Sequence, residues 1–65
     1  MTVRQQKAMR EASATTVRAP FRSTLDGLYR LGLCELPRQG ETDWYARLTT
    51  DGKALARVNR RKEQK

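Results

Sequence analysis

Few side chains in this 65-residue chain can perform catalysis. It has no histidine and a single cysteine, Cys34, so neither a Cys–His nor a Ser–His pair can form. One cysteine cannot hold a zinc ion, and neither a glycine-rich phosphate loop nor a cluster of carboxylates is present. We therefore expect a binding protein rather than an enzyme, without metal or cofactor, in which Cys34 is a small buried apolar residue.

The chemistry that the chain offers is positive charge. It carries 14 Lys and Arg against 7 Asp and Glu, a formal net charge of +7. This excess favours a polyanionic partner, namely nucleic acid, an anionic membrane or an acidic protein. No apolar run is long enough to span a bilayer, and no signal peptide is recognisable. Since a single cysteine also suits a reducing compartment, we expect a cytoplasmic protein without a membrane partner.

The strongest candidates for contact with DNA fall on a helix expected over residues 20–31. Its outward face would carry Arg22, Ser23, Asp26 and Arg30. Arginine can bind guanine with two hydrogen bonds, serine can donate to phosphate, and aspartate can accept from cytosine. Free N–H groups at the start of the helix would attract a phosphate. The same spacing gives ordinary i,i+4 ion pairs on a solvated helix, so both interpretations stand, with Arg22 and Arg30 favoured as contacts.

Other polar residues extend this set along the chain. Arg38 and Gln39 fall in a polar turn, where simple solvation is an equal alternative. Residues 59–65 are rich in charge and would add attraction that does not depend on base sequence, although such a segment would equally serve an acidic protein or solubility. The DNA-binding residues that we predict are Arg18, Arg22, Ser23, Arg30, Arg38, Gln39, Arg60, Arg61 and Lys62.

Positioning these residues requires regular elements, and the pattern predicts the order helix, short strand, helix, hairpin, helix. A first helix over residues 3–12 would be capped by Thr2. It would bury Ala8, Met9 and Ala12 on one face. Residues 13–19 are small or β-branched and indicate a loop or a short strand around residues 15–17.

The helix over residues 20–31 is expected to begin at Pro20, whose missing N–H costs nothing at the first helical position. Its buried stripe would comprise Phe21, Thr24, Leu25, Leu28 and the Leu31/Gly32 end. Gly32 fits the left-handed residue that closes a helix, and Leu33 would fold back onto Leu28 in a Schellman motif. The helix would thereby be held at a fixed angle to the segment that follows.

A hairpin is predicted after this junction, with its polar turn over residues 37–43. Cys34 and Leu36 would point one way and Glu35 the other. On the second strand, one face would hold Trp44, Ala46 and Leu48, and the opposite face Tyr45 and Arg47. Because Trp44 is expected in the core rather than stacked on a base, RNA binding is the weaker alternative.

Thr49 is a suitable N-cap for a last helix, with Asp51 in its first turn. The apolar stripe of that helix would be Ala54, Leu55 and Val58, and residues 59–65 would fray into a basic tail. We thus expect an α+β fold with one domain over residues 1–58 and a tail over residues 59–65. The predicted core comprises Leu25, Leu28, Leu33, Leu36, Trp44, Leu48 and Leu55.

Two stretches give this order of elements a likeness to a known family. TLDGLYRLGL contains Leu25, Leu28, Leu31, Gly32 and Leu33, and YARLTTDGKAL contains Tyr45, Arg47, Leu48, Thr49, Gly52 and Leu55. Together they resemble the winged helix-turn-helix of MarR-like bacterial regulators and their small actinobacterial or phage relatives, over residues 3–58. The resemblance implies that the helix before Gly32 is a recognition helix, that the hairpin is the wing with Arg38 and Gln39 at its tip, and that the last helix packs behind.

Two functions of different kinds follow. The first is a small DNA-binding protein, a transcriptional regulator or phage accessory factor, that reads double-stranded DNA with helix 20–31 and the wing. It would work as a homodimer or with a larger protein partner. The alternative is a winged-helix interaction module that binds an acidic surface of a larger complex. Affinity that depends on salt and on base sequence would distinguish DNA binding from the protein module.

Overall fold

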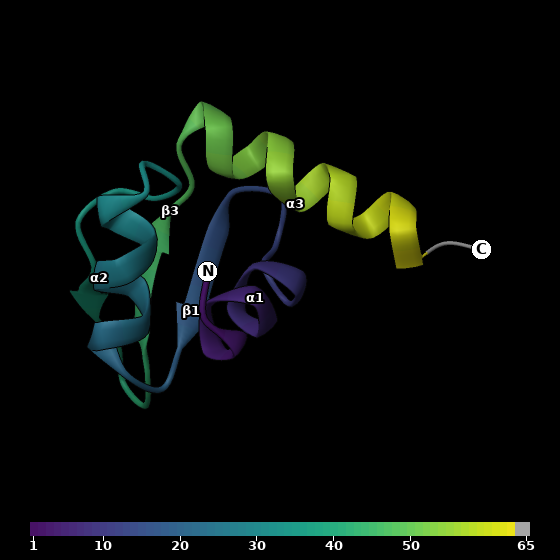
Figure 1. The fold of residues 1–65 in the computed structure, drawn as a ribbon. Helices are drawn as coiled ribbons and strands as arrows, with labels where there is room; N and C mark the ends of the chain where they lie inside the picture. The colour runs from purple at the N-terminus through teal and green to yellow at the C-terminus, as the bar shows by residue number, and fades with distance from the viewer. Residues whose placement is uncertain (64–65) are drawn as a thin grey trace.

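The structure is a computed structural model that describes the backbone of residues 1–63 and the side chains of residues 1–59. Its elements are α1 (Val3–Arg10), β1 (Thr16–Ala19), α2 (Arg22–Arg30), β2 (Arg38–Gln39), β3 (Trp44–Arg47) and α3 (Thr50–Glu63) (Figure 1). The predicted order of helix, short strand, helix, hairpin and helix is confirmed, and the fold is of the α+β class. The first strand of the hairpin is Arg38–Gln39, which pairs with Tyr45 and Trp44, so the predictions that this strand covers residues 34–36 and that Arg38 and Gln39 lie in the turn were wrong.

The three strands form one antiparallel sheet in the order β1-β3-β2, with β3 in the middle. Helices α1 and α2 contact each other and both contact β1, so they cover the same face of the sheet. Helix α3 contacts α1 and runs along the top of the molecule toward the C-terminus (Figure 1). The inward side chains of the strands, Val17, Ala19 and Ala46, are all buried. The other face of the sheet is open to solvent.

The core lies between the sheet and the helices. Its fully buried side chains are those of Met9, Val17, Leu25, Leu28 and Cys34. Of the predicted core residues, Leu25, Leu28 and Leu48 are buried, and Leu33, Trp44 and Leu55 are half-buried against the cluster. Leu36 is the exception, because 58% of its surface is exposed.

The exposure of Leu36 has a cause in strand pairing. Cys34 pairs with Leu48, and Arg38 pairs with Tyr45. Three residues lie between Cys34 and Arg38, whereas two lie between Tyr45 and Leu48. One extra residue in a strand pair interrupts the alternation of side chains, as in a β-bulge. The buried residue is therefore Pro37, and the prediction that Leu36 points inward was wrong.

Helix α2 begins at Arg22, two residues later than predicted. Phe21 is its N-cap residue, with φ −121° and ψ 134°. Because Phe21 keeps an extended backbone, its side chain does not follow the helical stripe of Leu25 and Leu28. The Phe21 ring is 54% exposed, with the Arg4 guanidinium 5.3 Å from its centroid. The C-cap residue Leu31 is likewise 54% exposed. The predictions that Pro20 starts the helix and that Phe21 and Leu31 are buried were wrong.

The other helices also differ from the prediction in detail. Helix α1 has the expected Thr2 cap, which forms a capping box with Gln5, but it ends at Arg10 rather than at residue 12. Within residues 50–59 of α3, Gly52 and Ala56 are buried, while Ala54 and Val58 are exposed. The backbone of residues 59–63 is helical, where a frayed tail was predicted. Residues 64 and 65 lie outside the described residues.

The junction after α2 fixes the position of that helix. Gly32 has φ +77°, the Leu33 N–H donates to the Leu28 carbonyl at 3.0 Å, and the Gly32 N–H donates to the Tyr29 carbonyl at 3.0 Å. These bonds form the predicted Schellman motif. Thr49 joins the same junction to α3, because its N–H donates to the Leu33 carbonyl and its hydroxyl donates to the Gly32 carbonyl. The C-terminal end of α2 is thus held by the chain that begins α3.

Candidate nucleic-acid interface

The predicted DNA-binding residues do not form one surface. Three of them, Arg22, Ser23 and Arg30, are exposed on α2, which packs on the helix-covered side of the sheet. Arg18 and Arg38 project from the opposite side. We call the first surface the α2 face, consisting of Arg22, Ser23, Asp26 and Arg30. We call the second the sheet face, consisting of Arg18, Arg38, Tyr45 and Arg47.

The α2 face begins at a helix N-terminus without a side-chain cap. The N-cap residue, Phe21, makes no side-chain hydrogen bond to the first turn. The Thr2 hydroxyl accepts from the Gln5 N–H in α1, and the Thr49 hydroxyl accepts from the Gly52 N–H in α3. The first N–H groups of a helix point outward and attract anions. In α2 these groups are left without a side-chain acceptor.

Arg22 is held by two interactions within the chain. Its guanidinium lies 5.2 Å from the centroid of the Trp44 ring. Its Nε lies 3.5 Å from Oδ1 of Asp26, in a pair whose side chains are 52% and 42% exposed. At such exposure an ion pair contributes little stability, so it orients the arginine more than it stabilises the fold. Among the described residues no ion pair joins Asp26 to Arg30, which leaves Arg30 as the unpaired cation of this face.

The sheet face is set by strand register. Tyr45 is the Cα partner of Arg18 on β1 and of Arg38 on β2. Directly opposed residues on antiparallel strands project to the same face. Because Val17, Ala19 and Ala46 are buried, the row Arg18–Tyr45–Arg38 must point to solvent. Both arginines are exposed and the tyrosine is half-buried.

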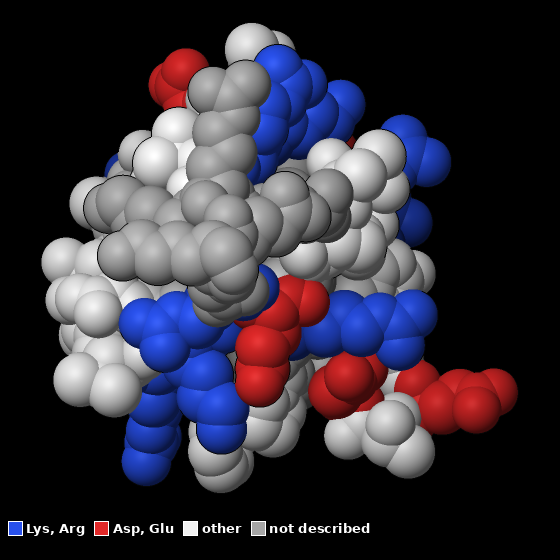
Figure 2. Space-filling view, turned by 90° about the vertical axis from the view of Figure 1, so that its right-hand side faces the viewer, with Lys and Arg blue, Asp and Glu red and all other residues white. Residues whose placement is uncertain are grey.

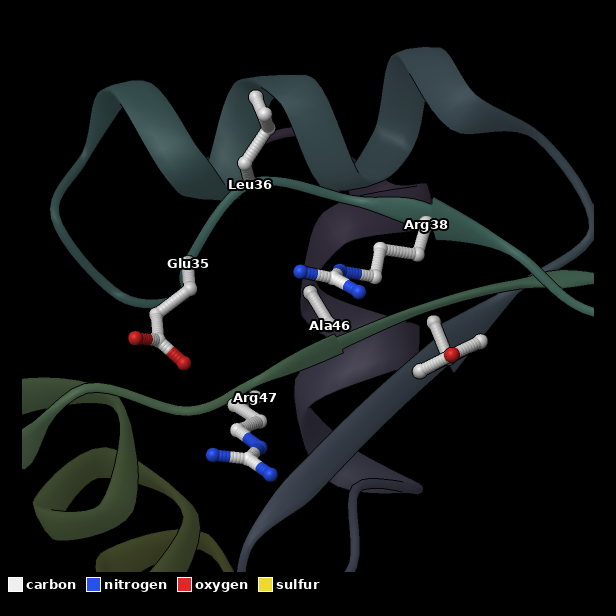
Figure 3. A pocket seen from close by; sticks show the side chains of 6 residues that line it. Glu35, Leu36, Arg38, Ala46 and Arg47 are labelled. Carbon is white, nitrogen blue, oxygen red and sulfur yellow. The ribbon is translucent and has the colours of Figure 1, made fainter.

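Two adjoining hollows lie along this surface. The first, of about 460 Å³, is lined by Glu35, Leu36, Arg38, Tyr45, Ala46 and Arg47. Figure 3 shows Arg38 and Arg47 on the side of the sheet that faces the viewer, with α1 behind the strands. The second, of about 670 Å³, shares Glu35 and Arg47 with the first and extends to Lys53 in the first turns of α3. The two hollows adjoin and together form a track from Arg38 to Lys53. Arg18 lines neither of them and lies instead beside a hollow of about 250 Å³ against α1.

Of the remaining predicted residues, Gln39 is the one whose side chain is described. Gln39 is exposed, but it pairs with Trp44. Its side chain therefore projects to the opposite face of the hairpin from that of Arg38. The side chains of Arg60, Arg61 and Lys62 lie outside the described residues. On the face at the C-terminal end of the molecule, Lys and Arg alternate with Asp and Glu, as Figure 2 shows. The charge there is mixed rather than gathered in one basic patch.

Cys34 has no catalytic environment. Its side chain is 2% exposed, and its Sγ donates to the Leu25 carbonyl at 3.6 Å. Burial, followed by the negative charges of Asp26 and Glu35, raises the pKa of the thiol to about 11. A thiol with a raised pKa stays protonated and is a poor nucleophile. Among the described residues no group of His, Cys, Asp and Glu side chains could hold a metal ion.

The prediction missed Tyr45 and Arg47 as members of a site. The signal that was present is the alternation of residues 44–48, which places Tyr45 and Arg47 opposite Ala46. The pairing of Tyr45 with Arg18 and Arg38 depends on contacts between distant segments, which alternation alone does not reveal.

Comparison with known proteins finds no match among family models, curated sequences or solved structures. Within residues 1–63, none of the helices has the length and apolar character needed to cross a membrane.

Proposed function

We propose that this chain is a small DNA-binding protein with a winged-helix-like arrangement, which binds duplex DNA through the α2 face and serves as a transcriptional regulator or phage-type accessory factor. The observation that supports this best is the uncapped start of α2, with Arg22 and Ser23 in its first turn. A phosphate placed there would accept hydrogen bonds from backbone N–H groups and meet a nearby guanidinium.

The length of α2 suits the major groove. Arg30 lies eight positions after Arg22, which at the helical rise of about 1.5 Å per residue corresponds to about 12 Å. The major groove of B-DNA is also about 12 Å wide. A helix lying in the groove with its N-terminus at one phosphate chain would therefore carry Arg30 across the base edges. In this arrangement Arg30 reads bases, and Arg22 and Ser23 fix the position of the helix.

The support for α2 differs from that in a complete helix-turn-helix. In the described part of the chain, α2 is the single helix between β1 and β2, so no separate positioning helix precedes it within that segment. Helix α1, which precedes β1 in the sequence, packs against α2. Gly27 allows this approach, since a Cβ at this position would collide with the Gln5 side chain. We propose that α1, together with the Gly32 junction, does the work of the positioning helix, while the β2–β3 hairpin serves as the wing.

A titration of duplexes tests the proposal. The preferred site is first selected from a random duplex library, and binding is then measured by fluorescence anisotropy at several salt concentrations. Arg30→Ala is expected to weaken the preferred site by about 1–3 kcal/mol and to affect random duplex much less. Arg57→Ala, which removes the same charge from the exposed side of α3, is the matched control. It should weaken both duplexes slightly and equally.

Asp26 provides a second variant. Asp26→Asn removes the carboxylate that pairs with Arg22 and that would repel a phosphate, so affinity for all duplexes should rise. If neither Arg30→Ala nor Asp26→Asn changes binding, α2 does not contact DNA. If wild-type protein binds no duplex even at low salt, DNA is rejected as the partner.

A second function, the protein-interaction module, is favoured by a different observation. Several large apolar side chains near α2 are about half exposed, namely Phe21, Tyr29, Leu31 and Leu36. Exposed apolar residues beside basic ones suit an acidic protein surface with an apolar centre. A partner complex that persists in excess competitor DNA and weakens with Leu31→Ser would support this function over DNA binding.

A further inference from the structure

We infer that the sheet face is a second nucleic-acid site, which takes single-stranded DNA by stacking an unpaired base on Tyr45 while Arg18, Arg38 and Arg47 hold the flanking phosphates. This site is separate from the α2 face, since the two lie on opposite sides of the sheet. The inference rests on the proposed function only in the choice of DNA as the polymer.

The first argument is geometric. Arg18 and Arg38 flank Tyr45 on the two neighbouring strands, and strands in a sheet lie about 4.8 Å apart. The ring is therefore at the centre of a row with a cation on each side. Proteins that bind single strands combine an aromatic ring for a base with cations for the backbone on either side of it.

The second argument is that these groups have no other partner. Among the described residues, none of Arg18, Arg38 and Arg47 takes part in an ion pair. In the same part of the chain, the arginines that stack on aromatic rings are Arg4 on Phe21 and Arg22 on Trp44, and none stacks on Tyr45. The tyrosine ring and the three guanidinium groups thus remain available to a ligand.

The third argument concerns which polymer conformation fits. In a duplex the faces of the bases are covered by their neighbours, so an aromatic ring on an open surface can stack only on an unpaired base. The hollow beside Tyr45, of about 460 Å³, falls within the range of ligand pockets, and the adjoining hollow continues the track toward Lys53. A single strand can follow this track, whereas the α2 face suits a duplex.

The negative charge of Glu35 restricts where the phosphates of a bound strand can lie. Glu35 lines both hollows and is the acidic residue among the lining arginines. A phosphate is disfavoured directly beside Glu35, so along this track the phosphates should contact Arg38, Arg47 and Lys53, with the edge of a base toward Glu35. Removing this charge with Glu35→Gln should strengthen binding of any polyanion at this face.

The experiment compares labelled oligo(dT), oligo(rU) and random duplex by fluorescence anisotropy at low salt. Tyr45→Leu removes the ring but keeps an apolar side chain, and it is expected to weaken oligo(dT) binding about 5- to 150-fold with duplex binding changed less than about twofold. Tyr45→Phe keeps the ring and should bind as wild type. Tyr29→Leu makes the same change at an exposed tyrosine of α2 and should leave oligo(dT) binding unchanged. Thermal melting of each variant confirms that it is folded.

An independent readout locates the site. In amide NMR spectra, oligo(dT) should shift the signals of β1, β2 and β3, and a duplex should shift those of α2. Equal losses for duplex and oligo(dT) in Tyr45→Leu, no binding of oligo(dT) by wild type, or binding of oligo(rU) more than tenfold tighter than oligo(dT) would each overturn the proposal. If Arg30→Ala loses duplex binding but still binds oligo(dT), the sheet-face proposal is supported. The experiment therefore distinguishes failure of the sheet face from failure of the α2 face.

Discussion

Two adjacent aromatic residues, Trp44 and Tyr45, have different roles because successive residues of a strand point to opposite faces. Trp44 packs against the core, and the Arg22 guanidinium lies over its ring. Tyr45 lies in the solvent-facing row between Arg18 and Arg38. The tryptophan thus links α2 to the hairpin, and the tyrosine lies on the solvent-facing side of the sheet.

Cys34 gives a prediction about pH. Its pKa is raised to about 11 in the folded protein, from an ordinary value of 9.0, mainly by burial. An unfolded chain therefore loses this proton at a lower pH than the folded one, and deprotonation favours unfolding as the pH rises from 9 to 11. We expect the free energy of unfolding to fall in this window by up to about 1.4 kcal/mol for each pH unit.

Urea unfolding at pH 8, 9 and 10 tests this expectation. Cys34→Ala, which cannot titrate at this position, is the reference for the other groups that ionise at high pH. The wild type should lose more stability than Cys34→Ala between pH 9 and pH 10. Parallel losses in both proteins would show that the thiol is not the source.

At the scale of elements, the junction between α2 and α3 determines how the α2 face is presented. Thr49 bonds to both Gly32 and Leu33, and it also caps α3. Gly52, in the first turn of α3, lies so close to the Leu33 carbonyl that a Cβ at this position would collide with backbone. One glycine ends α2, and another allows α3 to start directly against that end.

The two glycines predict different costs of substitution. At Gly32 an alanine would meet nothing within 4 Å, so it would cost only the left-handed conformation, about 1–2 kcal/mol. At Gly52 an alanine must push α3 away from Leu33, an overpacking that costs about 3 kcal/mol, and this outweighs the gain of up to about 1 kcal/mol in helix propensity. Chemical denaturation should therefore place both Gly32→Ala and Gly52→Ala below wild type. A Gly52→Ala protein as stable as wild type would contradict the close packing of α3.

At the scale of the whole molecule, the net charge of +7 is divided among separate regions. Arginines of the sheet face lie on one side of the sheet, and Arg22 and Arg30 lie on the other. Residues 60–65, which contain four basic side chains, come after the half-buried Leu55 and the buried Ala56 of α3 in the sequence. A long-range attraction to polyanions would therefore belong to the whole chain, whereas we propose base recognition only for the α2 face and the sheet face.

Removal of residues 60–65 separates attraction from recognition. The deletion takes away Arg60, Arg61, Lys62 and Lys65 together with Glu63, and it retains the part of α3 that packs on the core. We expect weaker binding to every duplex by the same factor and a shallower dependence on salt, by about 0.9 in log–log slope for each phosphate that the tail no longer neutralises. Anisotropy titrations of preferred and random duplexes over a salt series measure both quantities. A change in the ratio of the two affinities would mean that these residues read bases.

The sequence by itself determined the features that depend on neighbouring residues. The Thr2 and Thr49 caps, the left-handed Gly32 with its Schellman bonds, and the buried pair Leu25 and Leu28 were all predicted, because capping, helix closure and helical periodicity act within a few residues. The α+β class and the order of elements followed from these signals. So did the exposure of Arg22, Ser23 and Arg30 on one helix.

Only the tertiary structure decided what depends on contacts between distant segments. The extra residue between Cys34 and Arg38 exposes Leu36, and the fit of Gly52 against Leu33 turns α3 so that Ala56 is buried rather than Ala54. The row Arg18–Tyr45–Arg38 exists because β1 and β2 both pair with β3 in one register. Register is set by the packing of the whole sheet on its helices, and a shift of one residue would reverse every side chain. For this reason the α2 face could be predicted from the chain, whereas the sheet face could not.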